Sequence, residues 1–318
     1  MTGLVELGFG ARAALAVDGR GRVVAVYRRA AYLQVPGGLV ALTTPDVWRG
    51  PLHVRSAVLP AGLAPGDVVD VVGGCHVRIG RVGVVDLADA SVWRGALPDL
   101  APAEPVTLTA PRGRFVSPGG GPYRTGDTYS PERALSVTGS ASAANRWIAS
   151  AADVFAAAPP PALVTDERFA GRLEVALHRL RKADLAGVAR AIGGLGPGLT
   201  PAGDDTLAGI LLVARAVGGE VAEDDLVAVA RSVATTSVAR AFLEWAARGQ
   251  TVEPAHDLLA ALAAGDPATA AVHLCALARL GHTSGADLAY GLHLGLTHRN
   301  ECTGGPSEGP PMSIARRV

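Results

Sequence analysis

Lysine is almost absent from this 318-residue chain. The one lysine, Lys182, lies in a basic stretch typical of the exposed face of a helix. A Walker-type phosphate loop needs a lysine directly after its second glycine, and a Schiff-base enzyme needs a desolvated one. Lys182 fits neither arrangement, so the composition argues against both classes of protein.

Cysteine and long apolar runs are also scarce. Cys75, Cys275 and Cys302 form no C-x-x-C pair, which argues against a disulfide framework and a zinc ribbon. The start of the chain lacks a basic, apolar leader, and no apolar run approaches the roughly 20 residues of a membrane span. We therefore expect a cytoplasmic protein with no membrane partner. Basic and acidic residues balance at 29 each, so we expect no nucleic-acid partner.

The residue pattern changes along the chain and predicts an α+β protein of two domains. Over 1–110, short alternating segments with frequent turns predict a small β-barrel or sandwich. Strands are expected at 12–17, 22–27, 52–59, 68–72, 76–79 and 81–85, with a hairpin turn at Asp18-Gly19. Proline and glycine over 111–131 predict a linker.

Helical periodicity takes over at 132–299, which we predict to be an all-α domain with a glycine-rich ligand loop. Helices are expected at 132–157, 166–191, 204–217, 223–247, 255–264, 267–279 and 284–297. The tail at 300–318 contains several prolines and glycines and is expected to be disordered.

The most informative segment, residues 193–205, contains five glycines and two prolines before two acidic residues. It leads into a predicted helix, whose free N–H groups and dipole favour an anion. Gly198 and Gly203 have phosphate-loop spacing, but Asp204-Asp205 follows them in place of Lys-Ser/Thr. A Rossmann turn must follow a strand, and the preceding residues are predicted to be helical. The loop therefore predicts an anion site of another kind.

The pattern Gly-x-Asp-x-x-x-Gly occurs at 203–209 and again 82 residues later at 285–291. Each copy opens a predicted helix, and a threonine, Thr200 or Thr283, closely precedes each one. We expect the two helix starts to face one pocket. The last glycine of each copy, Gly209 or Gly291, would allow the helices to approach closely.

Three interpretations of the acidic side chains stay open at this point. Asp204 can cap its helix while Asp205 interacts with the dipole, and Ser284 with Asp287 can form a capping box. A carboxylate here can instead bind a hard cation or orient a substrate N–H. The third interpretation is general-base catalysis.

The sequence Gly-Leu-Gly-Pro-Gly-Leu-Thr-Pro-Ala-Gly-Asp-Asp at 194–205, with Gly-His-Thr-Ser-Gly-Ala-Asp at 281–287, resembles the AllH-like family. That family includes a subunit of oxamate carbamoyltransferase, an enzyme of anaerobic allantoin degradation. The resemblance covers roughly 165–298, and Thr206 stands where the family often has a bulky apolar residue. It implies carbamoyl exchange between oxalurate and phosphate, giving oxamate and carbamoyl phosphate, in a complex with other enzyme subunits.

We therefore expect a carbamoyltransferase subunit that binds a small anionic substrate between the two helix starts. The expected catalytic residues are Asp204, Asp205 and Asp287. The expected substrate-binding residues lie on the two loops: Gly196, Gly198, Leu199, Thr200, Gly203, His282, Thr283, Ser284 and Gly285.

Two other functions stay open. One is a non-catalytic small-anion binding or scaffolding protein, because the sequence assigns no nucleophile. The other is a phosphotransferase that uses Asp204-Asp205 for Mg²⁺, the one cofactor considered. No metal ligands are assigned.

Overall fold

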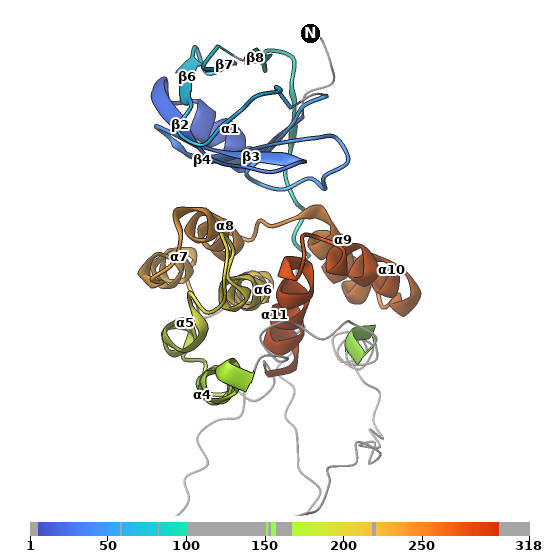
Figure 1. The fold of residues 1–318 in the computed structure, drawn as a ribbon. Helices are drawn as coiled ribbons and strands as arrows, with labels where there is room; N and C mark the ends of the chain where they lie inside the picture. Colours follow the sequence, from blue (N-terminus) through green and yellow to red (C-terminus); the bar gives the residue numbers. More distant parts are fainter. Residues whose placement is uncertain are drawn as a thin grey trace, which may run out of the picture.

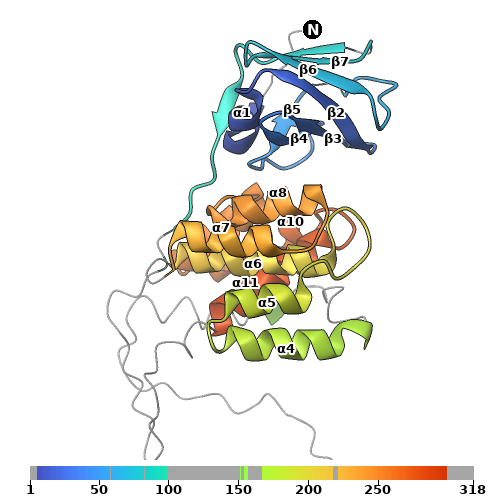
Figure 2. The same cartoon turned by 90° about the vertical axis from the view of Figure 1, so that its left-hand side faces the viewer.

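The computed structural model describes residues 6–57, 59–81, 83–98, 100, 151, 154–156, 167–217 and 221–298. The expected linker at 111–131, the expected tail at 300–318 and most of the expected helix at 132–157 lie outside these residues. A curled sheet from the N-terminal part lies over a group of helices from the C-terminal part (Figure 1, Figure 2). This arrangement confirms the predicted α+β fold class.

Nine strands of the described residues form one curled sheet, a half-barrel, in the order β8-β7-β6-β2-β3-β4-β5-β1-β9. Their bounds are β1 Glu6–Gly8, β2 Gly19–Val26, β3 Ala30–Val35, β4 Gly38–Thr43, β5 His53–Arg55, β6 Val68–Val72, β7 His76–Ile79, β8 Gly83–Asp86 and β9 Ser91–Trp93. The pairs β4–β5 and β1–β9 are parallel, and the other pairs are antiparallel.

A short helix, α1 (Phe9–Leu15), occupies most of the first predicted strand. The prediction of a strand at 12–17, and of a hairpin at Asp18-Gly19, was therefore wrong. The buried residues of α1 are Gly10, Ala11, Ala14 and Leu15, a spacing that places them on one face of a helix. That face packs into the core of the curled sheet.

The hairpin of β3 and β4 was not predicted from the sequence. Burial along β3 alternates, but β4 is buried at five consecutive positions because α1 packs against it and α8 also contacts it. A strand covered in this way loses the period-two pattern by which strands are recognised. The expected strand at 52–59 shortens to β5, whereas 68–72 and 76–79 match the observed strands.

The helices of the C-terminal part are α4 Ala170–Leu180, α5 Leu185–Ile192, α6 Ala202–Ala216, α7 Glu223–Ser232, α8 Ser237–Ala247, α9 Glu253–Ala263, α10 Pro267–Ala278 and α11 Ser284–His298. Two helices predicted as continuous are divided. The first breaks at Ala183, whose φ is 53°, before Asp184 caps α5. The second breaks after Ser232, and the side chain of Thr236 then caps α8. Local capping groups therefore decide both boundaries.

Helices α4-α5-α6 and α9-α10-α11 repeat one arrangement. In each unit the first two helices pack together, and an aspartate, Asp184 or Asp266, caps the second. The third helices, α6 and α11, pack side by side. Contacts between them pair Gly209 with Gly291 and then Val213 with Gly295, so the two helices run in the same direction. Their starts therefore lie at the same end of the helical layer.

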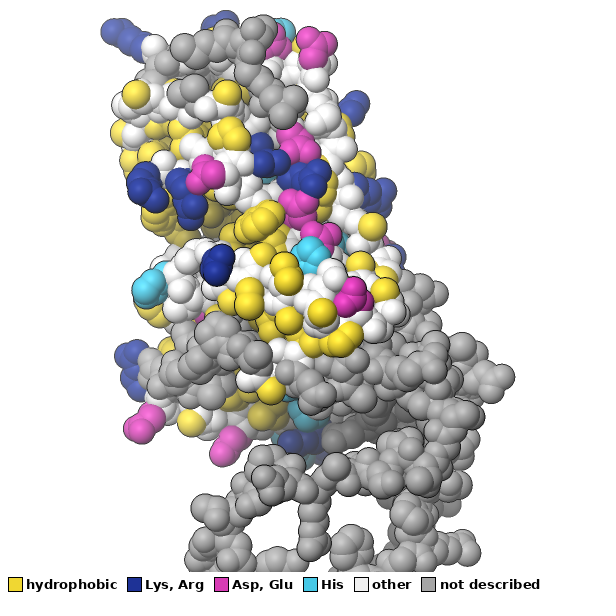
Figure 3. All heavy atoms as spheres, turned by 90° about the vertical axis from the view of Figure 1, so that its right-hand side faces the viewer, with side chains coloured by type: hydrophobic (Ala, Val, Ile, Leu, Met, Phe, Trp, Pro, Cys, Tyr) yellow, Lys and Arg dark blue, Asp and Glu magenta, His cyan; other side chains and the backbone are white. Residues whose placement is uncertain are grey.

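The sheet contacts the helices mainly through α8. Leu39 and Leu52 from the sheet side form a small core with Val238 of α8. Arg49 joins this junction by pairing with both Glu6 and Glu253. Figure 3 shows basic and acidic side chains together near this junction and hydrophobic ones over α9 and α10. None of the described helices is both long and apolar enough to span a bilayer.

Candidate functional site

The two Gly-x-Asp segments come together at the starts of α6 and α11. Oγ1 of Thr200 lies 3.1 Å from Oγ of Ser284, so the two hydroxyls form a hydrogen bond between the loops. The helices that follow lie side by side in both ribbon views (Figure 1, Figure 2). The two helix starts therefore lie together, while the pocket expected between them stays a prediction.

Gly209 and Gly291 lie where the two helices touch. A Cβ atom on Gly291 would lie 1.9 Å from the carbonyl oxygen of Thr206. A Cβ atom on Gly209 would lie 2.4 Å from the carbonyl oxygen of Leu288. Because both neighbours are backbone atoms, no side chain fits at either position. The prediction that these glycines permit close helix packing is confirmed.

Gly203 and Gly285 hold the helix starts against the preceding helices. Their N–H groups donate to the carbonyl oxygens of Leu195 and Leu280, at 2.8 and 3.0 Å. A Cβ atom at either position would lie within 2 Å of a backbone carbonyl oxygen, that of Ile192 or that of Leu277. Both N–H groups are therefore already used within the chain, which suits packing better than ligand binding.

The exposed part of the first loop has a different backbone. Gly196 and Gly198 have φ values of 117° and 94°, which side chains rarely adopt. A Cβ atom on Gly198 would meet nothing within 4 Å, so this part of the loop faces open space. Leu199 is half-buried against the small core at the sheet junction, and its carbonyl accepts a hydrogen bond from Thr236.

Asp204 is 2% exposed and bonds within the chain. One carboxylate oxygen accepts a hydrogen bond of 2.7 Å from the N–H of Gly194, and the other accepts one from the hydroxyl of Thr235. Burial raises the pKa of Asp204 above its ordinary value, although these two hydrogen bonds oppose the shift. Asp204 therefore ties the glycine loop to the segment between α7 and α8.

Asp205 lies in a different setting. Its Oδ2 atom is buried and accepts no hydrogen bond within the described part of the chain. Burial raises the pKa of Asp205 well above its ordinary value, and the charges of Asp287 and Asp204 raise it further. Hydrogen bonds from the Ser284 and Thr200 hydroxyls lower it in part. Asp205 therefore holds a proton more tightly than an ordinary aspartate.

The second loop contributes residues of unequal burial. Asp287 is fully buried, and its N–H donates to the carbonyl of Thr283 at 3.0 Å. Ser284 and Thr283 are half-buried, and His282 is exposed at the surface. Asp205, Thr200 and Ser284 thus form the centre of the candidate site, with Asp287 beneath them.

Tyr32 of β3 lies in the small core at the sheet junction, a position that the sequence did not reveal. Its ring packs edge-on against Phe242 of α8, with centroids 6.4 Å apart. Burial, with the charges of Tyr27 and Asp205, raises the pKa of Tyr32 to about 12. The sheet therefore places a neutral phenol in the small core that also contains Leu199 of the first loop. The signal was missed because the strand carrying Tyr32 was not predicted.

The described residues contain no group of three or more His, Cys, Asp or Glu side chains placed to hold a metal ion. The magnesium-dependent alternative therefore gains no support from the geometry.

Comparison with known proteins agrees with the motifs. Residues 192–296 match the family of oxamate carbamoyltransferase subunit AllH. The matched region begins at the end of α5 and contains both Gly-x-Asp segments, which confirms the resemblance to the AllH family over this region. The sheet, with Tyr32, lies outside the match. No solved structure matches the chain.

Proposed function

We propose that this chain is a subunit of a carbamoyltransferase that exchanges the carbamoyl group between oxalurate and phosphate, or acts on a related small ureide. One observation carries the proposal: both motifs of the AllH match converge on a single place, where half-buried Asp205 lies beside Thr200 and Ser284. The substrates proposed here are small anions, and they would bind between the starts of α6 and α11.

The first loop supplies uncharged donors for such an anion. Within the described residues, the N–H groups of the first segment that donate inside the chain are those of Gly193, Gly194, Leu195, Gly203, Asp204 and Asp205. The N–H groups of Gly196, Gly198, Leu199 and Thr200 are therefore available to a ligand. A ligand that used the hydroxyls of Thr200 and Ser284 would replace the hydrogen bond between them. Fixed donors of this kind stabilise the oxyanion that forms when a carbamoyl carbon is attacked.

Asp205 is the group that we assign to proton transfer. In the proposed reaction a phosphate oxygen attacks the carbamoyl carbon, and the bond from that carbon to the oxamate nitrogen breaks. The departing nitrogen must gain a proton, and hydrogen phosphate must lose one. A carboxyl group with a raised pKa can donate the first proton and accept the second, so the protons balance.

The neighbouring residues have supporting roles in this proposal. Asp204 positions the loop through Gly194 and Thr235, and the charge of Asp287 keeps the Asp205 proton in place. Tyr32 stays neutral because of its raised pKa, so it can donate a hydrogen bond at the sheet side of the site. Other subunits would complete the enzyme, in keeping with the family's description as a subunit.

The test is phosphate release from carbamoyl phosphate in the presence of oxamate, the reverse of the proposed reaction. It should be measured with the chain alone and with the complex that co-purifies with the tagged chain from its native host. We expect turnover by the complex, and we expect Asp205→Asn to lower kcat at least about 100-fold, as loss of general acid–base catalysis does. Asp224→Asn, at an exposed position in the first turn of α7, is the matched control and should act like wild type.

The pH profile of kcat adds a second readout. In the assayed direction the oxamate nitrogen attacks the carbamoyl carbon and gives its proton to Asp205 before phosphate leaves. The unprotonated carboxylate therefore starts the reaction, and kcat should rise as pH rises through its elevated pKa. Absence of turnover in the complex, or full activity of Asp205→Asn, would contradict the proposal. Binding of oxamate without turnover would instead favour the non-catalytic anion-binding alternative.

A further inference from the structure

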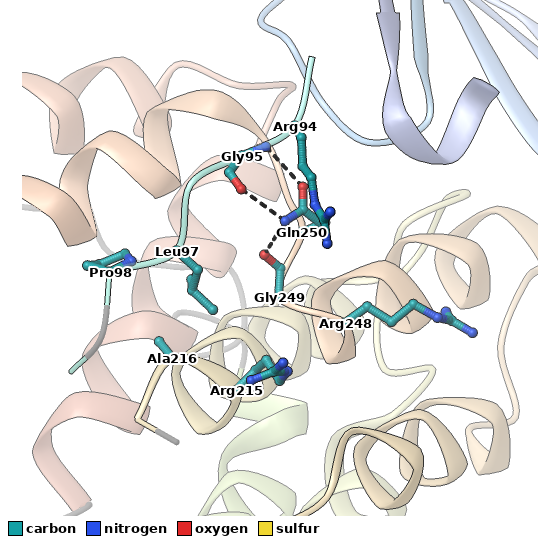
Figure 4. Close-up of a pocket in the computed structure, with 9 residues that line it drawn as sticks. All are labelled: Arg94, Gly95, Leu97, Pro98, Arg215, Ala216, Arg248, Gly249 and Gln250. Carbon is teal, nitrogen blue, oxygen red and sulfur yellow. Dashed lines mark hydrogen bonds between the residues drawn. The ribbon is translucent and has the colours of Figure 1, made fainter. Parts of the chain in front are cut away.

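A second cavity lies away from the AllH motifs, where the chain passes from the sheet to the helices. Its volume is about 470 Å³. Three segments far apart in the sequence line it: 94–98 after β9, the end of α6 at Arg215 and Ala216, and 248–250 after α8 (Figure 4). The ten residues from Asp205 to Arg215 along α6 separate this cavity from the candidate site by about 15 Å.

Buried hydrogen bonds fix the walls of the cavity. Gln250, which is 5% exposed, accepts from the N–H of Gly95 and donates to the carbonyl oxygens of Gly95 and Gly249, each at 3.0 Å (Figure 4). The N–H of Leu100 donates to the carbonyl of Ala216, also at 3.0 Å. The segment after β9 is therefore held against the ends of α6 and α8, and the cavity is formed before any ligand arrives.

The lining carries positive charge without a carboxylate. Three of its nine residues are arginines, and none is acidic. The guanidinium of Arg94 lies over the ring of Phe9, with its Cζ atom 4.8 Å from the ring centroid. Glu223 contacts Arg215 through Nε at 3.4 Å. Oε2 of Glu244 lies 3.5 Å from Nη2 of Arg248, so two carboxylates lie near the three guanidinium groups.

Arg248 is the most restrained of the three arginines. It donates to the carbonyl of Glu244 at 2.8 Å, and its guanidinium lies 5.4 Å from the centroid of the Trp245 ring. Arg94 and Arg215 are therefore the better placed to turn toward a ligand. Leu97, Pro98 and Ala216 form an apolar wall beside them.

We propose that this cavity binds a phosphate monoester with a small organic body. Guanidinium groups match the geometry of phosphate oxygens and form charge-assisted hydrogen bonds to them. The apolar wall would contact the organic body, and the cavity has the size typical of small-molecule sites. The site is separate from the proposed carbamoyltransferase centre, and Arg94 lies outside the family match.

Calorimetry on the full chain tests this proposal with four probes: inorganic phosphate, ribose 5-phosphate, adenosine monophosphate and adenosine. We expect a monoester to bind more tightly than inorganic phosphate, and adenosine not to bind. Arg94→Gln and Arg215→Gln should each weaken the monoester about tenfold, the loss of one charge-assisted hydrogen bond. Arg20→Gln removes an arginine that is exposed on β2 and paired with Asp70, so it serves as the matched control and should bind like wild type.

Asp205→Asn should also leave monoester binding unchanged, which separates a failure here from a failure of the proposed function. Circular dichroism should show that each variant is folded. The proposal would be overturned if neither monoester binds with a Kd below about 1 mM. Binding that is equal in wild type and both cavity variants would overturn it as well, because the ligand would then bind elsewhere.

Discussion

Replacing Gly291 with alanine tests the packing that brings the two motifs together. The added Cβ would lie 1.9 Å from the Thr206 carbonyl oxygen and 3.0 Å from Cα of Gly209, where ordinary contact begins at 3.4 Å. Both neighbours are backbone atoms, so α6 and α11 would have to separate. Overpacking of this kind costs about 1–3 kcal/mol, and the helix propensity of alanine returns at most about 1 kcal/mol. We expect the free energy of unfolding to fall by about 2 kcal/mol.

The assay is urea unfolding followed by circular dichroism, with Gly171→Ala as the matched control. Gly171 also lies within a helix, α4, but a Cβ atom there would meet nothing within 4 Å. The same substitution should therefore stabilise the protein at Gly171 by about 0.5–1 kcal/mol. Opposite signs at the two positions are the predicted result. Stabilisation, or no change, from Gly291→Ala would refute the close contact of α6 and α11.

Three further predictions concern charged side chains. Folded Asp205 binds its proton more tightly than the unfolded chain does, so stability falls as pH rises from the ordinary aspartate pKa toward the raised one. Asp205→Asn should therefore raise the Tm at neutral pH, with the difference vanishing in acid; a lower Tm at neutral pH would contradict the burial of this carboxyl. Asp204→Ala should instead destabilise by about 1–3 kcal/mol in urea unfolding, because the Gly194 N–H and the Thr235 hydroxyl lose their acceptor; an unchanged midpoint would argue against that role. Burial raises the pKa of Glu253, but the hydrogen bond and charge of Arg49 outweigh it and lower that pKa below its ordinary value. The pair then stabilises the fold above the ordinary glutamate pKa and loses this effect as pH falls through the lowered one. Arg49→Gln should therefore abolish this decrease when Tm is measured as pH is lowered. It should destabilise the fold by at most about 1 kcal/mol at neutral pH, since Arg49 is 38% exposed. The same decrease of Tm in acid in the variant and in wild type would count against the pair.

The sequence predicted the helical part of the fold better than the sheet. Amphipathic spacing and the N-cap at Asp266 identified α10, and the repeated Gly-x-Asp pattern identified the starts of α6 and α11. These signals are local, because each depends on residues within one or two helical turns. Strand β4 gave no such signal, since it is buried by packing from both sides.

The candidate site shows the same division. The repeated motif predicted that the two helix starts would lie close, and the structure places the hydroxyls of Thr200 and Ser284 3.1 Å apart. It did not separate the two adjacent aspartates, because their difference depends on Gly194 and Thr235, which contact Asp204 and not Asp205. The position of Tyr32 could not be predicted for a related reason, because its ring meets Phe242 of α8 only once the sheet packs on that helix.

The central claim is that one site between the starts of α6 and α11 binds the carbamoyl substrate. The most direct measurement is a crystal structure of the enzyme complex with oxamate and carbamoyl phosphate bound. The claim predicts difference density within hydrogen-bond distance of both Asp205 and Ser284. Density for both ligands at another place, with the starts of α6 and α11 empty, would contradict it.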